Sequence, residues 1–453
     1  MTLGVITNAD VLVCMDEARR EIAGGVVAFR DGRIEAIGTV SELAAPIAAA
    51  EEVIDASGCV VTPGLVNTHH HLYQTLTRAL PGATSAPLFG WLKRLYPAWA
   101  RYRPDDIFAA TQLGLAELAL SGCTLTSDHL YLFPNGATLD DAIAAAPTIG
   151  IRFHATRGAM SVGESEGGLP PDELVEKEPA ILADMIRVID RFHDPKPGAM
   201  IRVGVAPCSP FSVSPGLMRD AAVLARDKRV MMHTHLAEDA DDVAFSIERF
   251  GCRPGQYAES LGWTGPDVWH AHCVQLDAEE IELFARTGTG VAHCPCSNCR
   301  LGSGIAPIRA MMAKCVSLGL GVDGSASNDS GNLLHEARQA LLLQRAVGGA
   351  GALDPRDALY LATRGGADIL GRRDCGSLAP GKRADIAIWD MSGVASFGAW
   401  DKVAALILSP PASARDVMVE GGFVVRDGEL VRTPKEEVLR TADRSLARLR
   451  SLI

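Results

Sequence analysis

Three histidines and one aspartate follow apolar runs of the sequence, and their side chains are of the kinds that bind metal ions. His69 and His71 lie two residues apart, so on a strand both imidazoles face the same side. His235 ends a later apolar run, and Asp323 ends the last one. Neutral imidazoles and a carboxylate suit Zn²⁺ or Fe²⁺ and leave one coordination position for water. The pattern predicts a divalent metal site, with Zn²⁺ as the first choice and Fe²⁺ as the alternative.

Two further polar residues accompany the same runs. Glu238 comes three residues after His235, a spacing that can bring its carboxylate over a water molecule at the metal. Its alternative role is that of a solvated acid opening the next helix, because acids in a first turn favour the helix dipole. His272 ends another run, at a position in the strand alternation whose side chain faces the barrel interior. We expect it to hold the attacking water or stabilise charge on a substrate oxygen.

The elements that must position these residues alternate along the middle of the chain. Eight apolar runs, separated by Ala- and Leu-rich helical segments, fit strands at residues 59–67, 123–128, 151–157, 201–207, 230–235, 268–272, 290–295 and 318–323. Eight such units over about 300 residues fit a (β/α)₈ or TIM barrel, although a doubly wound open sheet has a similar alternation. The polar residues favour the barrel, because five runs end in His or Asp and closure gathers strand ends at one rim.

Both ends of the chain have the sequence pattern of short strands joined by tight turns. Asp31-Gly32 is a two-residue hairpin signal, and Asp427-Gly428 repeats it near the other end. The similar patterns suggest that the two ends pair in one small domain. The expected fold is therefore α/β, with a composite β-sandwich of residues 1–62 and 371–453 and a catalytic (β/α)₈ barrel of residues 63–370.

Composition and charge limit the classes of function. The chain has 453 residues, 47% apolar and 22% charged, which fits a globular enzyme with a large core. The net charge of −12 argues against a nucleic-acid partner. No apolar run approaches the ~18 residues of a membrane span, and no export signal is visible. Eleven scattered cysteines, an odd number, favour reduced thiols, so we expect a cytoplasmic protein.

The cysteines and glycine-rich turns are weaker candidates for chemistry. Cys294, Cys296 and Cys299 lie close together, but no second cysteine pair stands at a zinc-ribbon distance. A cysteine nucleophile would leave the histidines unexplained, so we expect small packing residues near the seventh strand. The sequence has no G-x-x-x-x-G-K-[ST] phosphate loop, and the turn 302–304 lacks the helix that a dinucleotide site needs.

Five motifs together resemble the amidohydrolase superfamily, in its branch of cytosine and guanine deaminases and triazine hydrolases. They are PGLVNTHHH (63–71), HLAE (235–238), HAHC (270–273), GVDG (321–324) and GSLAPGKRAD (376–385). The resemblance covers nearly the whole chain and implies a barrel with one divalent metal ion held by His69, His71, His235 and Asp323. Relatives with two metals bridge them with a carboxylated lysine ending the fourth strand, whereas here that strand ends in Pro207-Cys208.

Finer motifs imply a substrate class. Segments 71–78, 156–165, 167–172 and 293–298 resemble those of 8-oxoguanine deaminases. This resemblance implies hydrolytic deamination of an aminated purine-type heterocycle, with 8-oxoguanine and water giving urate and ammonia. A pterin deaminase acting on isoxanthopterin and a hydroxy-s-triazine amino- or chlorohydrolase are the alternatives on the same site. An inactive barrel acting as a binding subunit is a distant alternative, because the four ligands, Glu238 and His272 are all present.

The resemblance also implies roles for single residues. Glu238 would protonate the ring nitrogen next to the carbon under attack, Asp323 would accept the proton of the water, and His272 would steady the reacting centre. Gln74 would bind a ring edge, because an amide is both donor and acceptor. Trp91 is a candidate pocket wall, with an ordinary core position as its alternative. We expect a small heterocyclic substrate, no nucleic acid or membrane, and a homodimer or larger homo-oligomer.

Overall fold

A closed barrel of parallel strands forms the larger part of the molecule. The computed structural model describes residues 3–411 and 413–452, and within them eight parallel strands close the barrel in chain order. They are β6 (Leu65–Asn67), β7 (Cys123–Leu130), β8 (Arg152–Ala159), β9 (Ile201–Pro207), β10 (Met232–Leu236), β11 (Val268–His272), β12 (Gly290–His293) and β13 (Ser317–Leu320). The predicted (β/α)₈ barrel is confirmed.

The first predicted strand, residues 59–67, is two strands in two different sheets. β5 (Cys59–Pro63) pairs in the sheet of the chain ends, while β6 pairs in the barrel, and the chain passes between them at Gly64. A Cβ atom on Gly64 would lie 2.1 Å from the side chain of Thr124, so only glycine fits where the two sheets meet. The unbroken apolar run hides this division, because both strands are buried.

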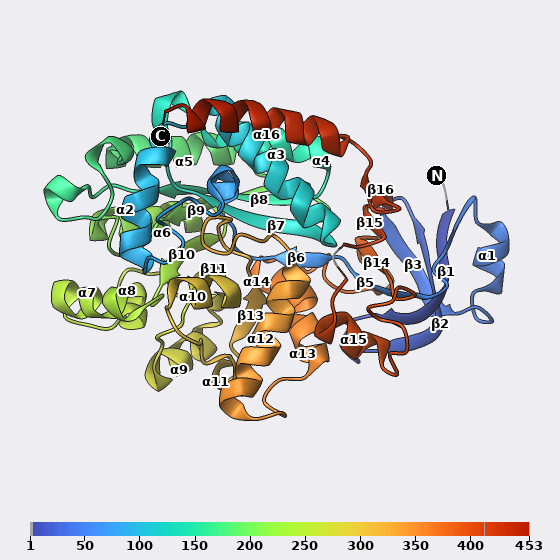
Figure 1. Ribbon diagram of the computed structural model, residues 1–453. Helices are drawn as coiled ribbons and strands as arrows, with labels where there is room; N and C mark the ends of the chain where they lie inside the picture. The colour runs from blue at the N-terminus through green and yellow to red at the C-terminus, as the bar shows by residue number, and fades with distance from the viewer. Residues whose placement is uncertain (1–2, 412, 453) are drawn as a thin grey trace.

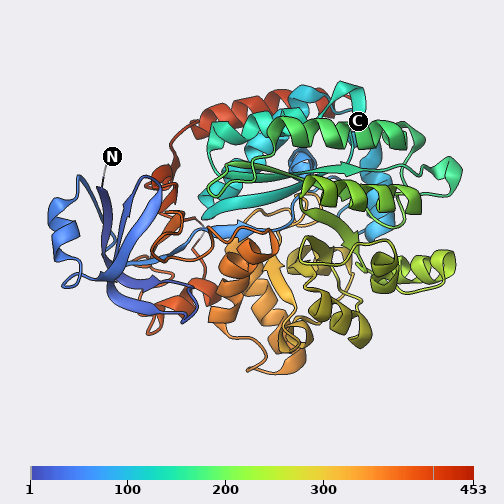
Figure 2. The same ribbon diagram turned by 180° about the vertical axis from the view of Figure 1, so that it is seen from behind.

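Helices cover the outside of the barrel, as Figures 1 and 2 show. α5 (Glu178–Phe192) illustrates the reason, because Ile181, Met185 and Val188 recur at helical spacing and are buried. The other helices are α1 (Ala44–Ala49), α2 (Leu88–Trp99), α3 (Pro104–Leu120), α4 (Leu139–Ile149), α6 (Pro215–Lys228), α7 (Ala240–Phe250), α8 (Pro254–Ser260), α9 (Ala278–Thr287), α10 (Pro295–Leu301), α11 (Ile308–Ala313), α12 (Leu333–Gly348), α13 (Pro355–Tyr360), α14 (Gly366–Ile369), α15 (Lys402–Leu408) and α16 (Lys435–Arg450). Shorter helical turns are η1 (Leu72–Thr77), η2 (Pro134–Gly136), η3 (Glu164–Glu166), η4 (Asp172–Leu174) and η5 (Leu361–Gly365).

Strands from both ends of the chain form a second, mixed sheet. Among the described residues it has nine strands, in the order β17 (Glu429–Leu430), β16 (Gly422–Arg426), β15 (Asp416–Val419), β14 (Ile386–Asp390), β5, β1 (Leu3–Val13), β2 (Glu21–Arg30) and β3 (Arg33–Thr39), with β4 (Glu52–Asp55) paired to β1. Asp31 and Gly32 join β2 to β3 with φ angles of 51° and 74°. Ile6 and Ile388, from opposite ends of the chain, share one buried cluster, which confirms the composite β domain.

A buried ion pair joins this terminal sheet to the barrel. Arg152, at the start of β8, lies 2.6 Å from Asp385, just before β14, and it also contacts the carboxylate of Glu420. These contacts lie at the amino ends of the barrel strands. The carboxyl ends therefore open on the opposite side, where α2 lies in Figure 1.

The helix α16 departs from the rest of the C-terminal segment, because it lies along α3 of the barrel in both views (Figures 1 and 2). Arg448 of α16 contacts the buried carboxylate of Asp106 in α3. We retain 1–62 with 371–453, and 63–370, as the proposed domains, with α16 packed across their boundary. In the described parts of the chain, no helix is both long and apolar enough to cross a membrane.

Candidate metal centre and active site

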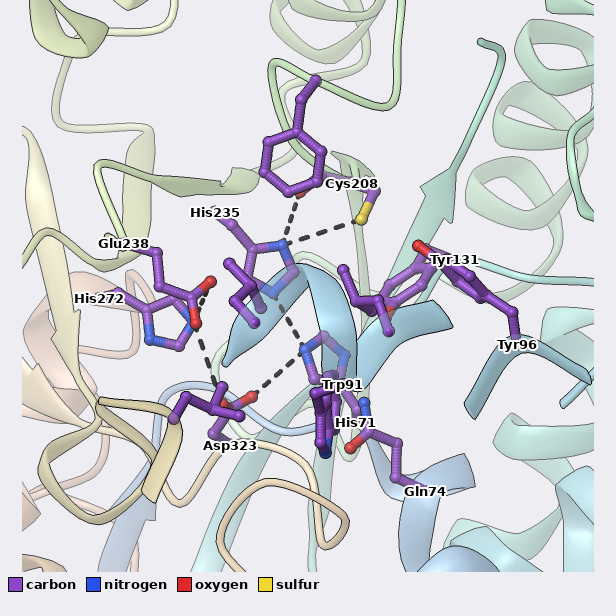
Figure 3. Close-up of a pocket in the computed structure, with 14 residues that line it drawn as sticks. His71, Gln74, Trp91, Tyr96, Tyr131, Cys208, His235, Glu238, His272 and Asp323 are labelled. Atoms are coloured by element: carbon purple, nitrogen blue, oxygen red, sulfur yellow. Dashed lines mark hydrogen bonds and ion pairs between the residues drawn. The ribbon is translucent and has the colours of Figure 1, made fainter. Parts of the chain in front are cut away.

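The predicted histidines and aspartate meet at the carboxyl end of the barrel. His69 and His71 follow β6, His235 lies in β10, His272 ends β11 and Asp323 follows β13. All five side chains are buried. All but His69 line one pocket, and Figure 3 shows their rings and carboxylate directed toward one another. The structure thus brings together residues that are up to 254 positions apart in the chain (323 − 69).

Four potential ligand atoms lie at a spacing that suits one small cation. The Nε2 atoms of His71 and His235 are 3.0 Å apart. Asp323 Oδ1 lies 3.1 Å from His69 Nε2 and 3.3 Å from His71 Nε2. Ligands that surround one Zn²⁺ at about 2.0–2.1 Å are about 3 Å from one another. These three separations fit neighbouring ligands of one ion.

Hydrogen bonds fix which nitrogen of His71 and His235 carries the proton. His71 Nδ1 donates to the carbonyl of His129 at 2.7 Å, and His235 Nδ1 donates to the carbonyl of Cys208 at 2.6 Å. Burial lowers the pKa of both rings, so both are neutral near pH 7. Each Nε2 then carries a lone pair. Two lone pairs only 3.0 Å apart repel each other, which a bound cation relieves.

His69 is held by a second histidine. His233 Nδ1 donates to the carbonyl of Trp269 at 2.8 Å, so His233 Nε2 accepts a hydrogen bond from His69 Nδ1, also at 2.8 Å. The lone pair of His69 is thereby placed on Nε2, which has no hydrogen-bond partner within the described chain and faces Asp323. A buried lone pair facing a carboxylate fits a divalent cation and leaves no other satisfactory partner.

The pKa values of two carboxyl groups in the pocket are shifted in opposite directions. Burial raises the pKa of Glu238 well above its ordinary value, and the charge of Asp323 raises it further. Burial acts in the same direction on Asp323, but the imidazoles of His69, His272 and His71 outweigh it and hold that pKa well below its ordinary value. His272 Nε2 lies 3.6 Å from Glu238 Oε2 and 4.0 Å from Asp323 Oδ2. The pocket therefore holds a proton donor and a proton acceptor side by side.

Glu238 is not the solvated acid of a helix start. α7 begins at Ala240, and its N-cap is Asp239, whose carboxylate accepts from the backbone N–H of Asp242. Glu238 precedes this cap and is only 4% exposed. Asp241 and Asp242 occupy the first turn of α7, whereas Glu238 lines the pocket.

Strained backbone accompanies three of the strand ends. Ala237, His272 and Asp323 have φ angles of 50°, 69° and 59°, in the left-handed region that residues with a Cβ atom seldom adopt. Ala237 lies between His235 and Glu238, so the reversal there turns both side chains toward one pocket. Such strain gathers at functional sites, where the surrounding structure over-determines the conformation.

Helix α2 forms one wall of the pocket. Leu88, Trp91, Leu92 and Tyr96 recur at helical spacing along the face that lines it. Trp91 is buried, and its indole N–H donates to the carbonyl of Ala326 at 2.9 Å. The structure thus places Trp91 at the pocket, as expected of a wall residue.

Gln74 also lines the pocket, from the turn η1 that follows His71. Its Oε1 lies 3.4 Å from the backbone N–H of Ala326, and its Nε2 lies 3.5 Å from the hydroxyl of Tyr73. Both are long contacts. The amide therefore retains capacity to bind a polar ring edge, and Gly324 leaves room for it, since a Cβ there would lie 1.8 Å from Gln74 Oε1.

Sequence reasoning missed the residues that hold Asp323 and His272 in place. Ser297 and Ser327 donate to Asp323 Oδ2 at 2.5 and 3.0 Å, and Asn298 Oδ1 accepts from His272 Nδ1 at 2.9 Å. Ser297 and Asn298 lie between Cys296 and Cys299 in the sequence. Of the neighbouring cysteines, Cys294 is buried but Cys299 is exposed. A signal was present for Ser297 and Asn298, because α10, the short helix that contains them, follows the barrel strand β12 almost directly.

His233 and the pocket residues Tyr96, Tyr131 and Phe211 were also missed. For His233 the signal was its parity with His235, because both lie on β10 two residues apart and face the barrel interior. The aromatic residues gave no such signal, because they come from helices and loops whose place over the strands is set by tertiary packing.

Comparisons with known proteins agree with this geometry. Residues 60–431 match the Amidohydrolase family. The chain is 49% identical over 411 residues to an 8-oxoguanine deaminase of Pseudomonas aeruginosa, covering 90% of this chain and 91% of that protein. It is 38% identical over 458 residues to a hydroxydechloroatrazine ethylaminohydrolase of Pseudomonas sp. strain ADP, covering 98% and 95%.

A solved structure extends the comparison to the fold. An atrazine chlorohydrolase from Arthrobacter aurescens TC1, complexed with zinc, superposes with a TM-score of 0.92 at 33% identity, over 98% of this chain and all of that one. The family match spans most of the sequence, and relatives of high identity are hydrolases. The chain therefore belongs to the amidohydrolase family and is a hydrolase that acts on C–N bonds of heterocycles.

Proposed function

We propose that this protein is a metal-dependent aminohydrolase of a purine-type heterocycle, with 8-oxoguanine and water giving urate and ammonia. The observation that carries the proposal is the convergence of His69, His71, His235 and Asp323 beside the buried carboxyl group of Glu238 in a pocket with aromatic walls. The relative at 49% identity supports the purine substrate.

The proposed ligands of one divalent cation are His69, His71, His235 and Asp323. Imidazole nitrogens with a single carboxylate suit Zn²⁺ first and Fe²⁺ second. When bound, such a cation supplies Lewis-acid activation of water at neutral pH. The zinc in the related chlorohydrolase structure supports this choice of metal.

The residues around the ligands move the protons. Asp323 accepts the proton of the attacking water, while Ser297 and Ser327 hold its Oδ2 in place. Glu238 donates its proton to the ring nitrogen next to the carbon under attack, which makes that carbon electrophilic. His272 is oriented by Asn298 and steadies the oxygen that adds to the ring. Breaking the bond to the exocyclic nitrogen, with return of a proton to it, then releases ammonia.

The shape and charge of the pocket support a flat, neutral substrate. Trp91 offers an aromatic wall beside Gln74, whose amide can bind a ring edge. Among the described residues that line the pocket, none is a lysine or an arginine. A phosphate or carboxylate on the substrate would therefore find no cationic partner of the protein in this pocket.

A second candidate is a hydrolase of hydroxy-s-triazines, which the relative at 38% identity and the related chlorohydrolase structure favour. Deamination of the pterin isoxanthopterin uses the same chemistry. Release of ammonia from 8-oxoguanine, guanine and isoxanthopterin, and of ethylamine from hydroxyatrazine, separates the three. We expect 8-oxoguanine to have the highest kcat/KM. A higher value for either of the other two classes would replace the purine assignment.

Metal removal tests the centre itself. Chelation should abolish turnover, and Zn²⁺ or Fe²⁺ should restore it, because the ligand atoms supply no activated water on their own. Turnover that survives complete metal removal would contradict the proposed centre. An inactive barrel remains the outcome if the pure protein neither binds metal nor releases ammonia or ethylamine from any of these compounds.

Two expectations about the setting of the reaction belong to the same proposal. We place it in the cytoplasm, supported by the odd number of scattered cysteines, and we expect a homodimer or larger homo-oligomer. Light scattering of the purified protein measures the second. The acidic net charge of −12 supports a small molecule rather than a nucleic acid as the partner.

A further inference from the structure

The side of the pocket opposite Glu238 and His272 holds a second group of polar side chains. Tyr96 comes from α2, Tyr131 follows β7 and Cys208 follows β9, and all three are buried. Figure 3 shows both tyrosines across the pocket from Glu238 and His272. A substrate ring attacked beside Glu238 would present its remote edge to this group.

These side chains are neutral hydrogen-bond donors. Burial raises the pKa of Tyr96 and of Tyr131 well above the ordinary value and raises the pKa of Cys208 to about 12. All three therefore keep their protons at neutral pH. A neutral O–H group in a pocket without cationic side chains suits an uncharged acceptor, such as a ring carbonyl oxygen.

Tyr96 differs from Tyr131 in the partner of its hydroxyl. The hydroxyl of Tyr131 interacts with that of Tyr73. The hydroxyl of Tyr96 has the thioether sulfur of Met160 as its hydrogen-bond partner within the described chain, at 3.9 Å. A thioether is a weak acceptor, and a buried hydroxyl with so poor a partner is uncommon in a native fold. In Figure 3 the oxygen of Tyr96 lies on the pocket side of its ring.

We infer that the Tyr96 hydroxyl donates a hydrogen bond to a carbonyl oxygen on the part of the substrate ring remote from the attacked carbon. This inference rests on the proposed function and deepens it, because it names the residue that distinguishes an oxo-substituted heterocycle from its analogue without that oxygen. The analogue leaves the buried hydroxyl with only the thioether, and sites built to bind a polar group discriminate strongly against substrates that lack it.

The test compares Tyr96→Phe with the unmodified metal-loaded enzyme on two matched pairs, 8-oxoguanine with guanine and isoxanthopterin with pterin. The members of each pair differ by one carbonyl oxygen attached to the ring. We expect the substitution to lower kcat/KM for the oxo compound about ten- to a hundredfold and to change the value for its partner less than threefold. Where a partner is not turned over, its inhibition constant against the oxo compound takes the place of kcat/KM.

Tyr257→Phe is the matched control. It removes a buried hydroxyl that has no hydrogen-bond partner in the described chain. Tyr257 lies on α8, outside the pocket, where its ring stacks on Phe250. The ratio of the two kcat/KM values should stay as in the unmodified enzyme. Metal content measured on both variants confirms that the centre is intact.

Two other results have distinct meanings. An equal loss on both members of a pair, or no loss on either, overturns the role of Tyr96 while the proposed function stands. An unmodified, metal-loaded enzyme that releases ammonia from none of the four compounds overturns the proposed function and the inference with it.

Discussion

Replacing His233 with leucine tests whether a second histidine holds the metal ligand His69. In the structure His69 Nδ1 donates to His233 Nε2 at 2.8 Å, and His233 Nδ1 donates in turn to the carbonyl of Trp269. Leucine fills similar space but accepts no hydrogen bond. The N–H of His69 is then left without its acceptor in a fully buried position, and the ring is free to exchange tautomers or rotate.

The expected cost follows from these contacts. A buried donor that loses its acceptor costs about 1–3 kcal/mol. Loss of the group that orients a metal-bound histidine lowers metal affinity by about 10–100-fold, which is about 1.4–2.8 kcal/mol. The two ranges agree, so we expect the dissociation constant for Zn²⁺ to rise by one to two orders of magnitude. His233→Gln supplies a carbonyl acceptor and should recover part of the affinity.

The assay is competition for Zn²⁺ between the apoprotein and a chromophoric chelator of known affinity, with metal content after dialysis as a second reading. His154→Leu is the matched control, because His154 is also a buried strand histidine beside Trp269, yet neither of its ring nitrogens has a hydrogen-bond partner in the described chain. The control should lose no metal affinity. Equal Zn²⁺ affinity in His233→Leu and His154→Leu would refute the reasoning.

Three further predictions concern proton transfer, pH and the junction of the two sheets. Glu238→Gln should keep its metal but lose about 10²–10⁴-fold in kcat, measured by ammonia release, and an unchanged kcat would remove Glu238 from the mechanism. Burial raises the pKa of Glu336 from 4.5 to about 7, so the folded state retains a proton that the unfolded chain releases. The free energy of unfolding, measured by urea titration, should therefore fall by about 3 kcal/mol between pH 4.5 and 7. Glu336→Gln should lack that part of the pH dependence. The same dependence of unfolding free energy on pH in the variant and the unmodified protein would contradict this prediction. Asp385→Asn should destabilise the protein by about 3 kcal/mol, because Arg152 loses a buried partner. Glu282→Gln, in an exposed pair with Lys314, should leave the stability almost unchanged. Similar losses in these two variants would show that the junction does not depend on the buried pair.

Much of the barrel could be predicted from the sequence because strand pattern and strand position are local properties. A buried parallel strand is a short apolar run, and the residue that ends it reaches the rim of the barrel. His235 and His272 end such runs, so their approach to one pocket follows from closure alone. The division of residues 59–67 into β5 and β6 could not be predicted in this way, because it depends on the contact of Gly64 with Thr124 from a distant strand.

The candidate site shows the same limit. Spacing predicts that His69, His71, His235 and Asp323 converge, and the structure places their ligand atoms at contact distances. Spacing does not reveal that His233 sets the tautomer of His69. That hydrogen bond requires the two imidazole rings to lie at the same level along the barrel axis, which the sequence does not specify. Nor does it place Tyr96, which reaches the pocket only because α2 packs over the strand ends.

The amino-acid order by itself determined the set of chemical groups and the architecture, since hydrophobic periodicity acts over a few residues and specifies each strand with its polar end. The tertiary structure alone decided protonation, orientation and the shape of the pocket. Burial raises the pKa of Glu238, while neighbouring imidazoles hold that of Asp323 below its ordinary value. Hydrogen bonds to backbone carbonyls direct the imidazole lone pairs to one point. Both effects depend on the groups that surround a side chain in space, and those groups come from parts of the chain that only folding brings together.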